Sequence, residues 1–192
     1  MVLLDINYQQ HYENIDFSTH ELTNMSFEEC EFTSCSFENM AFTGIVFTSC
    51  AFGKCSFVLT KVNETTFNDV VFKKCRLMGI NFTTCNDFLL NFEFSDSILD
   101  NVFISEKKLQ KIKINGCKLK DCDFMRVDFR MADFSGTSFK KVTFSDCNLE
   151  KADFRKAEGY SIDPVSNRIK NARFTLPEAQ SFLAFLNIKI DY

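Results

Sequence analysis

The dominant feature of the chain is an apolar residue at every fifth position. A first run extends from Phe17 to Phe82, and a second run, shifted in phase by two residues, extends from Phe94 to Phe154. The residue two places before each of these positions is mostly small or medium-sized and apolar, whereas the other three are mostly polar. A helix repeats every 3.6 residues and a strand every two, so neither produces a period of five with two inward positions. A solenoid with sides five residues long does.

The two runs also predict how the chain is organised. At 192 residues the chain is long enough for one buried core, so we expect a single domain over residues 1–192. Each coil of a solenoid contacts only its neighbours, so both ends need caps. The expected segments are an N-terminal cap over 1–14, a first stack over 15–84, a break or loop over 85–93, a second stack over 94–156, and a C-terminal cap, helix and tail over 157–192.

Several repeats match a known five-residue motif. The stretches Ala132–Phe134, Ala152–Phe154 and Cys122–Phe124 follow the pattern A(D/N)LXX almost letter for letter. Over about residues 15–156 the chain therefore resembles the pentapeptide-repeat family. The resemblance implies an all-β fold, a right-handed quadrilateral β-helix with four pentapeptides in each coil. Columns of like residues then recur every twenty positions, and stacked Phe side chains fill the axis.

The change of phase falls in segment 85–93, where Asp87 occupies an inward position. An unpaired carboxylate facing an apolar core is costly, so we expect the chain to bulge or loop out here. Two interpretations stay open, a contact loop with Phe88 and Leu89 at its tip and a simple joint between the two stacks. Lys107 is a second charge at an inward position. For it we expect a local distortion that lets the amine reach solvent.

The tail beyond Gly159 follows a different pattern. Thr175–Glu178 has the sequence of a capping box with Pro in the first turn, which predicts a short helix to about Leu186. One apolar face covers the end of the core, and a second face is left for a partner chain. The tail resembles the C-terminal dimerisation segment of Qnr-type quinolone-resistance proteins, which implies a homodimer. The residues expected at this interface are Phe182, Leu183, Phe185, Ile188 and Ile190.

The nine cysteines all occupy the smaller inward position, two residues before a central apolar residue. We expect free thiols packed as small hydrophobes, because an inward Cys column suits a disulfide poorly. A soft-metal column at Cys35, Cys55 and Cys75 is the alternative. The two histidines, His11 and His20, show no metal-ligand spacing, and no catalytic motif is present. We therefore expect no enzymatic activity, no cofactor and no metal.

The ends and the composition also bear on location. The apolar run at the start of the chain is only three residues long, too short for a signal peptide, and no stretch approaches the ~18 apolar residues of a membrane span. We expect a cytoplasmic protein outside the membrane.

The net charge of −4 hides an uneven distribution. Residues 1–72 contain ten acidic and two basic residues, whereas residues 73–192 contain sixteen acidic and twenty basic ones. At ~4.8 Å between neighbouring strands, three coils span about 14 Å. Duplex DNA of that length carries about eight negative charges, a number similar to the net charge of the first 72 residues.

The family resemblance gives this acidic half an interpretation. Members that resemble DNA in width and charge bind type II topoisomerases, and the Qnr-type ones protect gyrase from quinolones. The resemblance thus implies a DNA mimic whose partner is gyrase or topoisomerase IV, without direct nucleic-acid binding. The alternative is a structural or regulatory scaffold with an unrelated protein partner. The candidate contacts are the outward acids Glu21, Glu28, Glu29, Glu31 and Glu38.

Overall fold

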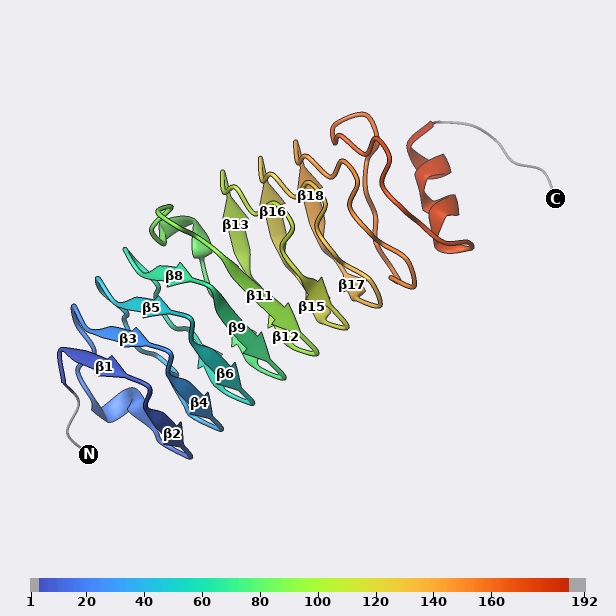
Figure 1. The fold of residues 1–192 in the computed structure, drawn as a ribbon. Helices are drawn as coiled ribbons and strands as arrows, with labels where there is room; N and C mark the ends of the chain where they lie inside the picture. Colours follow the sequence, from blue (N-terminus) through green and yellow to red (C-terminus); the bar gives the residue numbers. More distant parts are fainter. Residues whose placement is uncertain (1–3, 187–192) are drawn as a thin grey trace.

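Short parallel strands stack along the whole chain because every side of the coil is five residues long. The computed structural model describes residues 4–186, which form one elongated, right-handed, four-sided β-solenoid (Figure 1). Ile6 pairs with Ser26 and Ser26 with Val46, so one coil takes twenty residues. The predicted fold class is confirmed. None of the helices within residues 4–186 is long and apolar enough to span a membrane.

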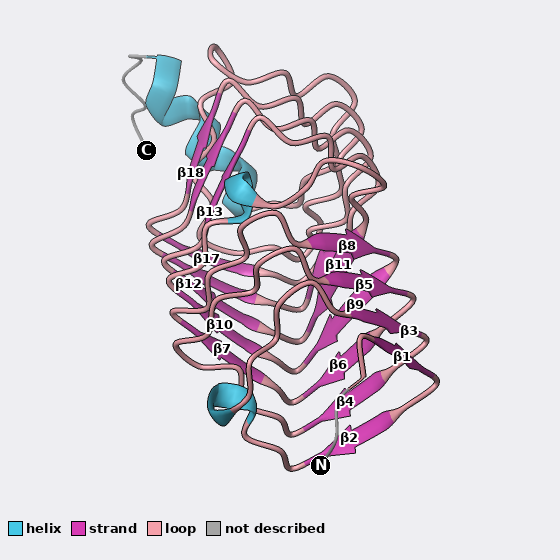
Figure 2. Ribbon diagram, turned by 90° about the vertical axis from the view of Figure 1, so that its left-hand side faces the viewer, coloured by secondary structure: helices cyan, strands magenta, loops and turns pink. Residues whose placement is uncertain are grey.

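The strands form four columns, which we name faces A to D in the order in which the chain passes them (Figure 2). Face A contains β1 (Ile6–Tyr8), β3 (Ser26–Glu28), β5 (Val46–Thr48) and β8 (Thr66–Asn68). Face B contains β2 (His11–Glu13), β4 (Glu31–Thr33), β6 (Ala51–Gly53), β9 (Val70–Lys73), β11 (Phe92–Ser95) and β14 (Ile114–Asn115). Face C contains β7 (Ser56–Val58), β10 (Arg76–Met78), β12 (Ile98–Asp100), β15 (Lys118–Lys120) and β17 (Ser138–Lys140). Face D contains β13 (Phe103–Ser105), β16 (Asp123–Met125) and β18 (Thr143–Ser145).

Isolated bridges extend these columns where no full strand forms. Face A continues from Lys108 to Asp128, Asn148 and Arg168. Two one-turn 3-10 helices, η1 (Phe17–Thr19) and η2 (Phe82–Thr84), replace a strand, and a longer one, η3 (Glu178–Leu186), follows the last coil. Each short helix begins where a side-chain oxygen accepts a backbone N–H two residues ahead, as Asn81 does from Thr83 at 2.9 Å.

The core is a stack of phenylalanine rings with thiols beside it. Phe32 and Phe52, one coil apart, stack with ring centroids 4.6 Å apart. Rings of neighbouring faces within a coil meet edge to face, as Phe52 and Phe57 do at 5.2 Å. All nine cysteines are buried and unpaired. The thiol of Cys50 lies 3.3 Å from the carbonyl oxygen of Phe27, so it serves as a weak donor as well as a small hydrophobe.

The corners between faces hold residues in the left-handed backbone region. Glu29, Asp69 and Lys151 are examples, with φ of 52°, 56° and 61°. Such values are uncommon for residues other than glycine, and here the continuous ladder on both sides imposes them. The side chains at these corners point away from the core, so the corners carry much of the exposed charge.

Both ends of the shaft differ from the expectation. The segment predicted as an N-terminal cap contains β1 and β2, which pair with the second coil in the ordinary register. The segment between Leu4 and Glu13 has Asn7 and Tyr12 at the inward central positions: the Tyr12 ring stacks on Phe32 at 4.9 Å, and its hydroxyl donates to the buried Asn7 side chain at 3.0 Å. At the other end, Asp153 pairs with Arg173, so the solenoid continues past residue 156.

The predicted capping box is wrong, although the helix forms at the expected place. The Thr175 hydroxyl accepts the backbone N–H of Lys156 at 3.2 Å, and the Glu178 carboxylate accepts that of Gly159 at 3.3 Å. Both residues of the motif therefore bind the last coil, and they attach η3 to the shaft.

Candidate partner-binding surface

The five acidic residues predicted to contact a partner lie on all four faces. Glu28 ends β3 on face A, Glu31 begins β4 on face B, and Glu29 occupies the corner between them. Glu38 lies on face C, which adjoins face B, and Glu21 lies on face D, which adjoins face A. The structure brings together three of the five around one corner and separates the other two.

The cluster at the A–B corner makes contacts with the coil beneath it. The Gln9 amide donates to Glu29 at 2.7 Å, and Nδ1 of His11 lies 3.2 Å from the Glu31 carboxylate. The carboxylate of Glu29 also raises the pKa of the Tyr8 hydroxyl, because ionisation of Tyr8 would place two negative charges side by side. This corner is thus negative, exposed and ordered.

The two acids outside the cluster differ in how freely they are presented. Glu38 is half-buried and accepts a hydrogen bond from the hydroxyl of Ser56 at 2.5 Å. Glu21 is exposed on face D. A partner that reads Glu28, Glu29 and Glu31 from one side does not reach Glu21 from the same direction.

The two halves of the shaft differ more in the number of their ion pairs than in the number of their charged residues. Within residues 4–186, the only ion pair before the loop is that of His11 with Glu31. The second half has many, most of them between neighbouring coils: Lys107–Asp87, Lys113–Glu93, Lys120–Asp100, Arg126–Glu106, Arg130–Asp128 and Arg155–Asp153. Acids of the first half therefore keep most of their charge uncompensated.

The break between the stacks is a protruding loop. Phe92 pairs with Val70, a spacing of twenty-two rather than twenty, so the coil gains two residues before β11. Phe88 is 69% exposed and Leu89 is 57% exposed, whereas Leu90 packs against the core. The side-chain oxygen of Asn86 accepts the backbone N–H of Phe88 at 3.0 Å and shapes the turn. The predicted bulge is present, with both apolar residues at its tip.

The interpretation of Lys107 is wrong. Its side chain is 5% exposed, and its amine donates to the carbonyl of Cys85 at 2.8 Å and to the carboxylate of Asp87. Asp87 itself is 76% exposed. The buried amine thus extends outward beneath the loop, and its contacts with the Cys85 carbonyl and the Asp87 carboxylate hold the start of the loop against the shaft. The signal was in the sequence, because two opposite charges twenty residues apart in the same position of the repeat face each other in adjacent coils.

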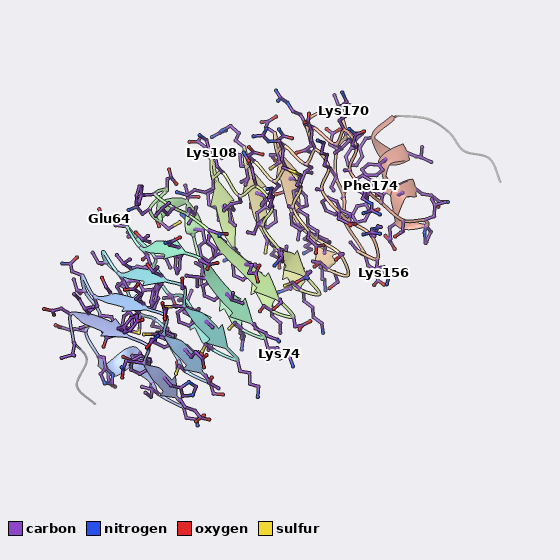
Figure 3. The ribbon with its side chains drawn as sticks, in the orientation of Figure 1. Glu64, Lys74, Lys108, Lys156, Lys170 and Phe174 are labelled. Carbon is purple, nitrogen blue, oxygen red and sulfur yellow. The ribbon has the colours of Figure 1, made fainter. Side chains whose placement is uncertain are left out.

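The C-terminal helix closes the end of the core. The ring of Phe182 meets that of Phe174 edge to face at 4.7 Å, and Phe174 stacks on Phe154 at 5.2 Å. Figure 3 shows Phe174 beside the C-terminal helix. Leu183 and Phe185 are half-buried. Ile188 and Ile190, also predicted at a dimer interface, lie outside the described residues, so the tail interface stays a prediction.

The part of the surface formed by residues 4–186 carries shallow polar depressions. One, about 440 Å³ in volume, is lined by residues that include Arg126, Asp128 and Arg168. Another of about 400 Å³ adjoins the loop and is lined by Asp69, Asn91 and Lys111, among others. Within the described part of the chain, no three His, Cys, Asp or Glu side chains gather into a potential metal site.

The sequence matches two descriptions of the same family. The description "Pentapeptide repeat region" matches residues 25–87 and 45–121, and "Pentapeptide repeats (8 copies)" matches residues 108–140 and 122–158. Together they cover more than half of the chain. The chain belongs to the pentapeptide-repeat family. A comparison with curated proteins finds no significant match.

Two solved structures of QnrB1 share the fold. A trypsin-treated form of QnrB1, a plasmid-mediated fluoroquinolone resistance protein, matches 97% of this chain and 100% of its own, with a TM-score of 0.65 and 14% identity. A second trypsin-treated QnrB1 structure covers 97% of this chain and 92% of its own, with a TM-score of 0.55 and 17% identity. HetL, from the cyanobacterium Nostoc sp. strain PCC 7120, covers 87% of this chain and 86% of its own, with a TM-score of 0.36 and 14% identity. At these identities the likeness to the two QnrB1 structures concerns the fold alone.

Proposed function

We propose that this pentapeptide-repeat protein is a non-catalytic binding protein whose acidic N-terminal half imitates duplex DNA, and that its partner is a type II topoisomerase, gyrase or topoisomerase IV. The observation that carries the proposal is the uncompensated charge of residues 1–72, ten acidic against two basic residues on a narrow rod. The fold that the chain shares with QnrB1, a fluoroquinolone resistance protein, supports the same partner and suggests protection from quinolones.

The geometry favours the A–B corner of the second coil as the centre of this contact. Glu28, Glu29 and Glu31 lie there within four residues of sequence and face outward. Their carboxylates stand in for phosphates, so binding weakens steeply as salt screens the charges. Glu21 and Glu38 lie on other faces and contribute only if the partner wraps around the shaft.

The second candidate is a scaffold for an unrelated protein. Its support is the distribution of the acids over all four faces, since a DNA-binding groove contacts a rod mainly from one side. The two candidates differ in which acids matter and in which partner is captured.

The test is binding to purified gyrase and topoisomerase IV at several salt concentrations, with supercoiling by gyrase measured in the presence of a quinolone. The variant Glu28→Lys, Glu29→Lys, Glu31→Lys removes the corner cluster, and Glu150→Lys with Glu158→Lys changes charge in the second half as a control. We expect the corner variant to lose binding and protection, and the control to keep both. If the wild-type protein neither binds either enzyme nor alters supercoiling at micromolar concentration, the topoisomerase proposal fails and the scaffold replaces it.

A further inference from the structure

Along one corner of the shaft, the order of charges is such that a second copy running in the opposite direction would place a base opposite each acid. Along the corner between faces A and B, each coil presents one exposed residue, and nearly all share the left-handed conformation. The residues of this A–B column, in chain order, are Gln9, Glu29, Ser49, Asp69, Asn91, Lys111, Met131, Lys151 and Asn171. Asn91 takes the place at the loop because it directly precedes β11, as Asp69 directly precedes β9.

The charges of the column are symmetric in position and opposite in sign about Asn91. Asp69 and Lys111 lie one coil away on either side, about 5 Å along the shaft, and Glu29 and Lys151 lie three coils away, about 14 Å. Reversing the direction of the column therefore exchanges each acid for a base. Gln9, Ser49, Met131 and Asn171, which fill the other places, carry no charge.

These charges are free to meet a partner. Asp69, Lys111 and Lys151 are exposed, and none of them takes part in an ion pair within residues 4–186. Glu29 accepts the neutral amide of Gln9 and lies beside the neutral hydroxyl of Tyr8, and it takes part in no ion pair within residues 4–186. The column therefore carries charge of both signs that no ion pair within the described residues engages, with its acids in the first half of the shaft and its lysines in the second.

The middle of the column also supplies an apolar contact. The loop tip, Phe88 and Leu89, projects next to Asn91. Beside it lies the depression of about 400 Å³ whose lining includes Asp69, Leu90 and Lys111. This depression is shallow and mostly polar, and its volume leaves room for a side chain. The projection and the hollow lie next to each other on one chain.

We propose that the A–B column is a seam along which two copies of this chain associate antiparallel, around a two-fold axis at Asn91. In a two-fold interface the same patch serves both partners, so each contact occurs twice. Asp69 of each copy then meets Lys111 of the other, and Glu29 meets Lys151. The loop tip of each copy packs against the hollow of its partner.

Other corners do not offer this arrangement. The corner between faces B and C carries Lys54 and Lys74 in the first half, and Asp96 and Lys156 in the second, so reversal brings Lys54 and Lys74 no matching pair of acids. Figure 3 shows Lys74 and Lys156 on one edge of the shaft and Lys108 and Lys170 on the opposite edge. Two convex corners in contact bury less than the ~1,000 Å² of a typical stable interface, so the association is weak and sensitive to salt.

The inference goes beyond the proposed function and is tested without any topoisomerase. Sedimentation of the full chain at about 10–200 µM follows self-association in 50 mM and 500 mM salt. We expect dimers at low salt that dissociate at high salt. Asp69→Lys or Lys111→Asp alone places two like pairs in the seam and weakens association at least tenfold. Asp69→Lys combined with Lys111→Asp restores both pairs and returns the dissociation constant to within about threefold of wild type.

Matched controls separate the seam from general charge effects and from the tail interface. Glu64→Lys and Lys74→Glu change corner residues of the same conformation on other corners, and we expect no change in association. In Leu89→Cys the new thiol lies near the two-fold axis, so a short bis-maleimide joins two copies at low salt. A dimer held by the tail places these thiols several coils apart and gives no cross-link.

Three outcomes overturn the proposal. They are a monomer at 200 µM in low salt, a dimer that the combined exchange fails to restore or that gives no cross-link through Cys at position 89, and equal weakening by the control substitutions. Glu29 belongs to both surfaces, so association along the seam competes with gyrase for it. Failure of the seam still leaves the gyrase proposal standing, because Glu28 and Glu31 lie outside the column and the exchange leaves Glu29 unchanged.

Discussion

Substitutions at Lys107 and Asp87 test whether the ion pair between them stabilises the loop. Asp87→Ala leaves a buried ammonium with the Cys85 carbonyl as its remaining partner. Removing one partner of a fully buried ion pair costs about 3–5 kcal/mol. Asp87 is 76% exposed, so water takes over part of its role and we expect a loss of about 2 kcal/mol.

Lys107→Met removes the charge instead of its partner. The corresponding positions in the next two coils are Val127 and Cys147, both apolar and buried, so a methionine fits the core there. We expect Lys107→Met to be at least as stable as the wild type, and the double variant with Asp87→Ala to behave like Lys107→Met alone.

Hydrogen exchange of the amides that anchor the loop gives a local measurement, which suits a solenoid because its coils open separately. The N–H of Asn86 donates to the Thr65 carbonyl at 2.9 Å, and that of Asn91 donates to Phe67 at 2.8 Å. A loss of about 2 kcal/mol makes their exchange roughly thirty times faster in Asp87→Ala. If exchange is unchanged in Asp87→Ala, or if Lys107→Met accelerates it as much, the pair does not hold the loop in the way described.

Three further predictions follow from the core and the C-terminal end. Titration of the denatured, non-reduced protein finds about nine free thiols, since all nine are buried and unpaired, and fewer than seven contradicts the packing. Burial raises the pKa of Cys50 and of Cys117 to about 12, so the unfolded chain loses these protons first, and the free energy of unfolding falls above about pH 9, by up to ~1.4 kcal/mol per pH unit for each such thiol. Thermal unfolding between pH 7 and pH 10.5, compared with a Cys50→Val, Cys117→Val variant that shows a smaller decline, measures this effect. Phe182→Ala loses the contacts with Phe174 and Tyr160 and destabilises the last coil by about 1–3 kcal/mol, seen as faster amide exchange there, whereas Gln180→Ala on the exposed side leaves it unchanged.

The period of the sequence by itself determined the architecture. An apolar residue at every fifth position, with a second small one two places earlier, allows only a coil whose sides are five residues long, because every other register exposes Phe or buries charge. The same pattern predicted the inward cysteines and the bulge at Asp87, since each follows from which positions face the core. Local signals were weaker guides. Thr175–Glu178 reads as a capping box, but both side chains bind the coil below.

Tertiary structure decided which residues from different coils meet, and that is where the candidate surfaces arise. Glu29 and Lys151 are six coils apart along the chain, and only the four-sided winding aligns them on one corner. The predicted acids are separated for the same reason, because residues five apart in sequence turn onto different faces. Lys107 finds Asp87 because coils stack in register, and that contact explains how a charge at an inward position is tolerated. A period in sequence fixes the inside of a solenoid, whereas its outer surface depends on how the coils stack and turn.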